Sequence, residues 1–281
     1  MACILNRTRI PFIIFTLIVL ARPAWAQLSV SPTIIRFSGT ELTQAVTVEN
    51  TGPTEQTSRI TLVNFQMLPG GRIVLGDGPA ENGRFAGSLV RFSPRQLTLR
   101  PGESQIVRFQ MHAPGHLPDG EYQAYILVQE IPEIDALDAP TSSGNDGLAV
   151  DLRAVFGVAI PLIIEKGDLS ATASIPSARI EPLPDGRPAV ALRIERSGDR
   201  SVRGDVSILA DGTEIATVAN VAIYVPTAYR DLVVPITWPS KLSLTDHQIE
   251  IRFREPQERP GAATAVFRFH GSGDGVASTE P

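Results

Sequence analysis

Short segments in which apolar and polar residues alternate, separated by turn-forming residues, run through most of this sequence. Alternation with a period of two predicts β-strands, because successive side chains of an extended chain point to opposite faces. Examples are Gln44–Asn50, Ser104–Met111 and Glu121–Pro132, each of which lies next to proline or glycine. Helical periodicity of any length is missing from the sequence. The pattern therefore predicts an all-β fold of antiparallel strands.

The strand-like segments form two blocks, separated by the short polar stretch Glu165–Leu169. The first block contains about seven segments, which is typical of an immunoglobulin-like sandwich. Within it, Leu28–Phe37 contains Pro32, which predicts an edge strand or a bulge, and Arg59–Leu68 reads as one strand. We predict two immunoglobulin-like β-sandwich domains, residues 27–166 and 167–270, set at an angle like a boomerang, and a disordered tail over residues 271–281.

Two local motifs support this architecture. In the second block, Asp211-Gly212 stands between two alternating runs, and this dipeptide tolerates the positive φ angles of a tight hairpin turn. In the first block, Asp119–Tyr122 resembles the tyrosine corner of sandwich domains, where the phenol caps a neighbouring backbone turn. Tyr122 is therefore expected to be structural.

The first 26 residues have the order of a secretory signal peptide. A basic start with Arg7 and Arg9 precedes the apolar run Pro11–Ala21, and Ala24-Trp25-Ala26 fits a small-x-small cleavage site. The alternative is an uncleaved anchor, but the run is shorter than the roughly 20 residues that span a bilayer. We expect cleavage before Gln27 and a mature protein without a membrane span.

Composition excludes several classes of function. Of the 25 basic residues, three leave with the signal peptide, so 22 face 30 acidic residues and the net charge is −8. This balance argues against nucleic acid as a partner. The only cysteine, Cys3, also leaves, which removes any cysteine nucleophile or disulfide from the mature chain.

The long segment Leu148–Ile164 holds the clearest functional signal. Its even-numbered residues from Leu148 to Ile160 are all apolar, and the segment is longer than a typical strand of five or six residues. The loop before it, Asp135–Gly147, has almost nothing to bury. Such a strand is either a core strand of its own domain or an edge offered to a partner.

Four stretches, taken in order, resemble the periplasmic pilus-assembly chaperones of the chaperone–usher pathway, the PapD-like family. They are SPTIIRF with QAVTVENTG, VRFSPRQLTLRPGESQIVRF, DGEYQAYILVQEIP, and the alternating strand that leads into IPLIIEKG. The resemblance covers Leu28–Lys166, and over the second block it is architectural only. It implies two immunoglobulin-like domains, the first of which lends its last strand to a pilus subunit that lacks its own.

The resemblance implies an exported pilin-like subunit as the client and an outer-membrane usher as a further partner. An added strand fills an apolar groove and pairs free backbone groups at the same time. The residues implied to bind the subunit are Leu148, Val150, Leu152, Ala154 and Phe156, with the half from Ala154 onward also suited to a core role.

The sequence departs from the family at the anchor for the subunit's C-terminal carboxylate. The family's anchoring arginine falls on Ile34 and its lysine on Phe156 or Gly157, so neither basic residue is present. Arg36 and Arg153 lie nearby and are candidates for a displaced anchor. The alternative is that each is simply a solvated surface arginine.

The sequence does not favour an enzyme, a cofactor or a metal site. His112 and His116 have the spacing of a helical zinc pair, but Pro114 and Gly115 between them exclude that helix. Two hypotheses remain: a periplasmic chaperone that donates a strand, and an exported two-domain binding or structural module without that activity.

Overall fold

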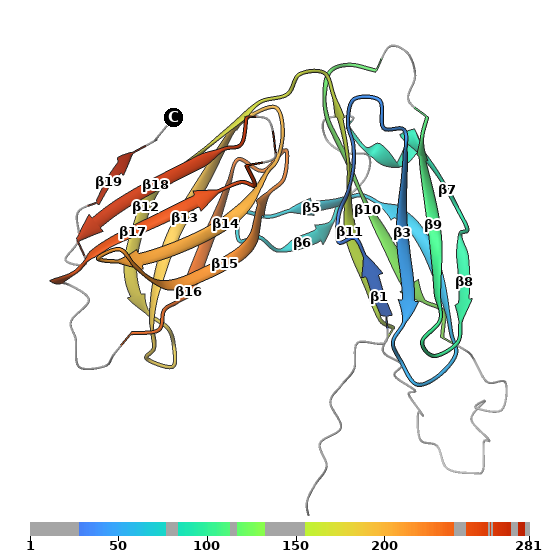
Figure 1. The fold of residues 1–281 in the computed structure, drawn as a ribbon, viewed down its shortest axis with the longest axis horizontal. Helices are drawn as coiled ribbons and strands as arrows, with labels where there is room; N and C mark the ends of the chain where they lie inside the picture. Colours follow the sequence, from blue (N-terminus) through green and yellow to red (C-terminus); the bar gives the residue numbers. More distant parts are fainter. Residues whose placement is uncertain are drawn as a thin grey trace, which may run out of the picture.

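The structure, a computed structural model, describes residues 28–76, 84–112, 117–132, 155–238, 246–257, 259, 261–270 and 275–278. Within these ranges the regular elements are β-strands, apart from one 3-10 turn, η1 (Ala86–Leu89). Figure 1 shows two sandwiches set at an angle, which confirms the all-β, two-sandwich prediction. The described part of the chain contains no helix long and apolar enough to cross a membrane.

The first sandwich consists of a four-stranded sheet, β1-β3-β9-β7, and a five-stranded sheet, β2-β11-β10-β4-β8. Alternate side chains of both sheets meet in one apolar core, which includes Phe37, Phe109 and Leu162. The strands are β1 (Leu28–Ser31), β2 (Ile35–Phe37), β3 (Thr43–Asn50), β4 (Gln56–Val63), β7 (Val90–Ser93), β8 (Gln96–Leu99), β9 (Ser104–Met111), β10 (Gly120–Glu130) and β11 (Gly157–Lys166).

Pro32 divides the predicted first strand in two. β1 pairs antiparallel with β3 in one sheet, whereas β2 pairs parallel with β11 in the other. Each half stands at the edge of its sheet, where the missing N–H of a nearby proline is tolerated. The edge prediction for this segment is therefore confirmed, and the chain changes sheets between Ser31 and Ile35.

The predicted tyrosine corner is confirmed. The hydroxyl of Tyr122 donates to the carbonyl oxygen of Pro118, four residues upstream, at 2.8 Å. The Arg84 guanidinium lies 5.7 Å from the centre of the Tyr122 ring. Tyr122 therefore stabilises the turn that leads into β10, the strand that pairs with β11.

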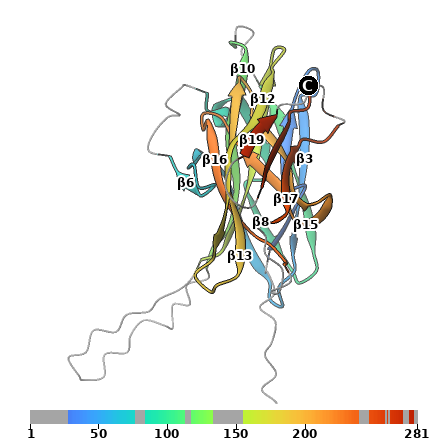
Figure 2. The same ribbon diagram turned by 90° about the vertical axis from the view of Figure 1, so that its left-hand side faces the viewer.

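The segment predicted as one strand, Arg59–Leu68, is interrupted at Asn64. β4 ends at Val63, and β5 (Phe65–Met67) forms a separate hairpin with β6 (Ile73–Leu75). The hairpin turn is closed by a bond from Gly71 N to Leu68 O at 2.7 Å, and Gly71 has φ +78°. Figure 1 places this hairpin between the two sandwiches, and Figure 2 shows β6 at one side of the molecule.

The second sandwich packs a three-stranded sheet, β12-β13-β16, on a five-stranded sheet, β15-β14-β17-β18-β19. Its core includes Ile194, Ile208 and Phe253. The predicted tight turn is present, with φ 48° at Asp211 and 81° at Gly212. The strands are β12 (Ala171–Pro182), β13 (Pro188–Gly198), β14 (Val202–Ala210), β15 (Thr213–Ile223), β16 (Tyr229–Pro235), β17 (Gln248–Arg254), β18 (Thr264–His270) and β19 (Gly275–Ser278).

Two strands of the second sandwich differ from the sequence analysis. β12 contains Pro176 and few large apolar residues, so its alternation is weak, and its register shifts between Ser174 and Ser177. β19 lies in the segment that was predicted to be a disordered tail. Pairing of Gly275–Ser278 with β18 corrects that prediction for these residues. The neighbouring strand edge supplies backbone partners that composition alone does not reveal.

Candidate functional site: an open strand edge beside the domain junction

The two edges of β11 are occupied to different extents. Along one edge, β10 pairs antiparallel with the whole strand, from Gly157 to Lys166. Along the other, β2 pairs only with Leu162–Ile164. Within the described residues, no strand covers this second edge from Gly157 to Pro161. An uncovered edge presents a row of backbone donors and acceptors on which another strand can pair.

The side chains of β11 change from buried to exposed toward this open stretch. Ile160, Leu162 and Ile164 point into the core of the first sandwich, and Val158 packs against that core. Phe156, on the same alternating face, is 61% exposed. Its carbonyl oxygen still accepts a bond from Glu130 N at 3.0 Å, so the backbone continues beside β10 beyond the strand.

The structure therefore describes only one of the five residues predicted to bind the subunit. Phe156 lies exposed at the start of β11, as a partner contact requires. Leu148, Val150, Leu152 and Ala154 lie outside the described residues, and so does Arg153. The assignment of these residues to subunit binding stays a prediction.

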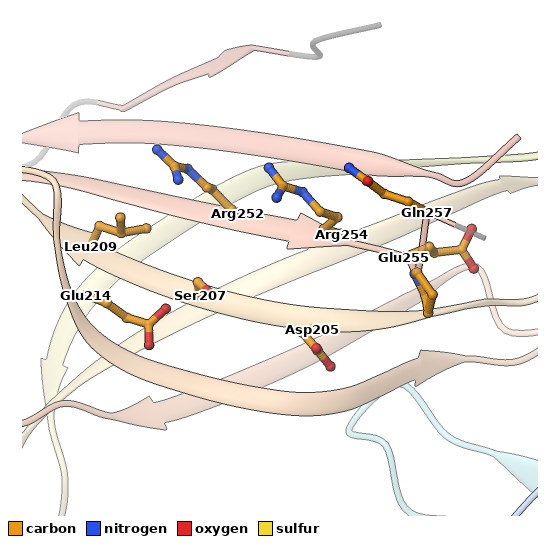
Figure 3. Close-up of a pocket in the computed structure, with 9 residues that line it drawn as sticks. Asp205, Ser207, Leu209, Glu214, Arg252, Arg254, Glu255 and Gln257 are labelled. Atoms are coloured by element: carbon orange, nitrogen blue, oxygen red, sulfur yellow. The ribbon is translucent and has the colours of Figure 1, made fainter. Parts of the chain in front are cut away.

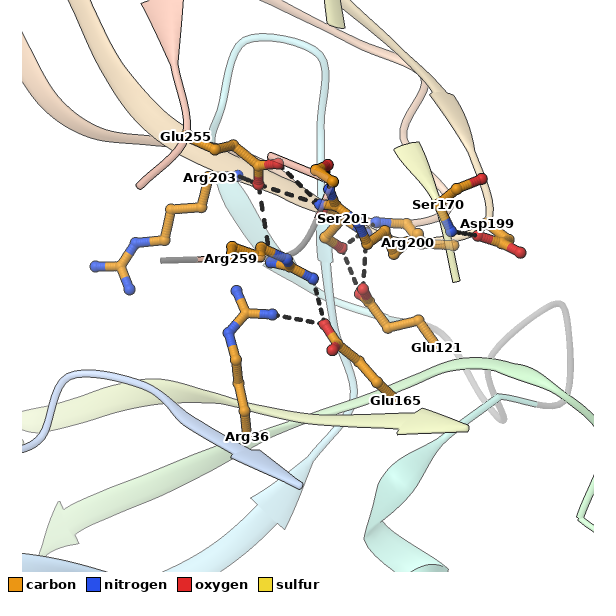
Figure 4. A network of polar contacts seen from close by, with 12 residues as sticks. Arg36, Glu121, Glu165, Ser170, Asp199, Arg200, Ser201, Arg203, Glu255 and Arg259 are labelled. Atoms are coloured by element: carbon orange, nitrogen blue, oxygen red, sulfur yellow. Dashed lines mark hydrogen bonds and ion pairs between the residues drawn. The ribbon is translucent and has the colours of Figure 1, made fainter. Parts of the chain in front are cut away.

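At the far end of the strand, β11 meets a group of charges from both domains (Figure 4). The parallel pairing of β2 with β11 brings Arg36 next to Glu165, and Arg36 Nη1 donates to Glu165 Oε1 at 2.8 Å. Arg259, from the loop between β17 and β18, donates to the same oxygen. Burial lowers the pKa of Arg259, the positive charge of Arg36 lowers it further, and Glu165 opposes both effects.

The residues at the predicted anchor positions do not lie together in the structure. Ile34 belongs to an apolar contact between the domains, and Arg36 lies in the ion pair with Glu165. Phe156 and Gly157 lie at the opposite end of β11 from Glu165. Sequence reasoning missed Glu165 and Arg259, because their 94-residue separation leaves no local signal.

A buried carboxylate also joins the two domains. Glu121, on β10, is 1% exposed and accepts a bond from Ser201 N at 2.7 Å. The Ser201 hydroxyl donates to the other oxygen of the same carboxylate and accepts a bond from Val225 N at 3.0 Å. A buried charge is tolerated when its hydrogen bonds are satisfied. Glu121 therefore holds the start of β14 against β10 (Figure 4).

Apolar and backbone contacts complete the junction. Met67, Ile163 and Tyr224 form a small buried cluster against which Ile34 packs. Burial, together with the nearby Tyr224 and Glu121, raises the pKa of Tyr125. The β5–β6 hairpin is tied to the second sandwich, since Thr227 Oγ1 donates to Met67 O at 2.6 Å and Asp231 N donates to Pro69 O at 2.8 Å. These contacts link the β5–β6 hairpin and β11 of the first sandwich to the second sandwich.

A separate hollow lies on the outer face of the second sandwich (Figure 3). Its acidic lining residues are Asp205 on β14, Glu214 on β15 and Glu255 directly after β17, and its basic ones, Arg252 and Arg254, come from β17. Arg252 is already paired with Glu250. The mixture of charges favours neither an anionic nor a cationic ligand.

Among the described residues, no group of three or more His, Cys, Asp or Glu side chains is placed to hold a metal ion. His112 is described and exposed, whereas His116 lies outside the described residues.

No protein-family model and no curated protein sequence matches this chain. Among solved structures, it is similar to the CsuC–CsuE chaperone–tip adhesion subunit complex from Acinetobacter baumannii, with 14% identity, a TM-score of 0.45, and coverage of 86% of this chain and 98% of that one. The CupB2 chaperone of Pseudomonas aeruginosa gives 14% identity and a TM-score of 0.44, covering 85% of this chain and 98% of that one. The YadV chaperone gives 13% identity and a TM-score of 0.44, covering 86% of this chain and 100% of that one. The structures that resemble this chain are thus pilus chaperones of the chaperone–usher type, at identities and TM-scores that assign neither its family nor its function.

Proposed function

We propose that this protein is a periplasmic chaperone that stabilises an exported pilin-like subunit by lending it the strand that leads into β11. The observation that carries the proposal is the uncovered edge of β11 from Gly157 to Pro161, next to the exposed Phe156. A subunit that lacks one strand has an apolar groove and unpaired backbone groups. The segment from Leu148 to Phe156 supplies both kinds of partner.

The energetics favour this role for an alternating segment. Each apolar side chain of the even-numbered series that enters such a groove contributes on the order of 1.5–3 kcal/mol. Backbone pairing along the edge fixes the register, because a shift by one residue would turn every apolar side chain to the wrong face. The signal peptide predicted over residues 1–26 is consistent with a periplasmic location, and an outer-membrane usher is the expected receiver of the complex.

The end of the open edge suggests the direction of the bound strand. A strand paired with Gly157–Pro161 stops where β2 begins, at Ile35, and Arg36 follows at once. A carboxylate is the strand end that suits arginine there, because a guanidinium can bind it through two parallel hydrogen bonds. The subunit strand would then run parallel to β11, with its C-terminus at the domain junction. This supports Arg36 as the displaced anchor.

The test compares charged substitutions at three exposed or partner-facing positions. Phe156→Asp is expected to leave the free protein within about 0.5 kcal/mol of the native stability, as substitutions at exposed positions usually do, and the proposal predicts the same for Val150→Asp. Both should abolish soluble complex formation with a small exported pilin-like subunit that lacks its final strand, because a carboxylate would enter an apolar groove without a partner.

Ile106→Asp provides the matched control, since Ile106 is an exposed apolar residue on the other sheet of the same sandwich. Complex formation is followed by co-expression and size-exclusion chromatography, and stability by urea denaturation. Stable Phe156→Asp and Val150→Asp proteins that capture the subunit as well as the Ile106→Asp control would contradict the proposed function.

A further inference from the structure

Glu165 forms ion pairs with two arginines at the domain junction. One carboxylate oxygen, Oε1, accepts hydrogen bonds from both Arg36 and Arg259. The three side chains are shielded, with exposures of 27%, 19% and 17% for Arg36, Glu165 and Arg259. Both guanidinium groups therefore share Glu165 in a poorly solvated place, where charge-assisted hydrogen bonds are strong, and Arg259 Nη1 also lies 3.8 Å from Glu255 Oε1.

We infer that Glu165 is an internal carboxylate that occupies the arginine pair while no client is bound, and that it lowers the affinity for a client strand by competing with its C-terminal carboxylate. This inference rests on the proposed function, which brings a strand end to Arg36. Both carboxylates present the same chemistry to the same donors. Only molecules in which Glu165 has released the arginines bind the incoming group fully, so the apparent dissociation constant rises by the inverse of that fraction.

The junction can undergo this exchange without losing its geometry. Glu165 belongs to the first sandwich and Arg259 to the second, so their bond is one link between the domains. Other links do not involve it: Ser201 N donates to Glu121, and Thr227 Oγ1 donates to Met67 O. Removing the Glu165 charge therefore leaves these links between the domains in place while it frees the donors that Arg36 and Arg259 direct at Glu165.

The experiment measures peptide binding to the full mature chain by fluorescence anisotropy at low salt. The probe is a labelled octapeptide of alternating valine and threonine, made with either a free C-terminal carboxylate or a C-terminal amide. If Glu165 holds the arginines in about nine molecules of ten, Glu165→Gln should bind the carboxylate peptide about tenfold more tightly than the native protein does. Its affinity for the amide peptide should not change.

Two further variants define the site. Arg36→Gln should lower the affinity for the carboxylate peptide to that for the amide peptide. Asp185→Asn is the matched control, because Asp185 is an exposed carboxylate paired with Arg187 in the second sandwich, and it should change neither affinity. If Glu165→Gln does not fold, Glu165→Asp tests the same point, since a shorter carboxylate withdraws from the arginines and should give a smaller gain.

The outcomes separate the two proposals. Weaker or unchanged binding of the carboxylate peptide by Glu165→Gln, with amide binding intact, overturns the competition and leaves strand capture standing. Failure of both peptides to bind the native protein, or binding that Phe156→Asp does not weaken, overturns strand capture and the competition with it.

Discussion

The edges of β11 in the first sandwich and of β18 in the second are covered to different extents. In the second sandwich, β18 has a partner on each edge, with β17 on one side and β19 pairing with Val266–Phe269 on the other. In the first, β11 is fully paired only with β10, and β2 covers three residues of its other edge. The difference arises because the chain changes sheets after Ser31, so that only a short piece remains to cover β11. Of these two strands, only β11 has an edge that is mostly uncovered.

The two sandwiches also use different polar groups to fasten their turns. The first uses mostly neutral ones: Tyr122 donates to Pro118 O, and the Asn50 amide donates to Thr54 O and Leu99 O, while Glu103 Oε2 accepts a bond from Arg100 N. The second uses charges, among them a buried pair between Arg200 and Glu255. In the described part of the chain, every carboxylate with a lowered pKa lies in the second sandwich. The second sandwich should therefore be the one that responds to charge removal and to acid.

The largest effect is expected from a substitution in the buried Arg200–Glu255 pair of the second sandwich. Arg200 is 2% exposed, and Glu255 also accepts bonds from Arg203 N and Ala263 N. Arg200→Ala should destabilise the second sandwich by about 3–5 kcal/mol, because it removes the nearer of the two arginines that pair with the buried Glu255, at 2.9 Å against 3.8 Å for Arg259. Trp238 is the only tryptophan beyond the signal peptide, so its fluorescence during urea denaturation reports on that domain. A midpoint unchanged from the native protein would contradict the comparison.

A smaller effect is expected in the first sandwich. Tyr122→Phe removes one hydrogen bond to Pro118 O while it keeps the ring in the core. The expected loss is about 0.5–1.5 kcal/mol. It should appear in the circular-dichroism transition of the first sandwich and leave the Trp238 transition in place. A shift of both transitions together would mean that the two sandwiches unfold as one unit.

The smallest effect concerns acid. Although burial acts to raise the pKa of Glu250, hydrogen bonds from Arg268 and Arg252 lower it below its ordinary value of 4.5. The unfolded chain therefore binds this proton first as the pH falls, so the stability that Glu250 contributes is complete above about pH 4.5 and is lost as the pH falls through the lower folded value. Surface pairs of this kind contribute up to about 1 kcal/mol.

Glu250→Gln should thus reduce the slope of stability against pH below 4.5, as measured by the Trp238 transition. Glu49→Gln, at an exposed carboxylate of the first sandwich, is the control and should leave that slope as it is. If Glu250→Gln and the native protein had the same slope, sensitivity to acid would not distinguish the second sandwich from the first.

Features decided by neighbouring residues could be predicted from the sequence. Ser104–Met111 forms a strand over the predicted range, and the Asp211-Gly212 turn and the Tyr122 corner are present. Each depends on local backbone preference or on partners a few residues apart.

Features that depend on contacts with distant residues could not be predicted from the sequence. The sequence did not show that Asn64 separates β4 from a hairpin that contacts the second sandwich, or that Gly275–Ser278 would pair with β18. It indicated a basic residue near Ile34 but not that Glu165 would accept bonds from Arg36 and Arg259. Alternation specifies a strand because it is a property of consecutive residues. Whether that strand's edge is open, and which charges stand at its end, depends on which remote segment packs there, and only the tertiary structure determines that.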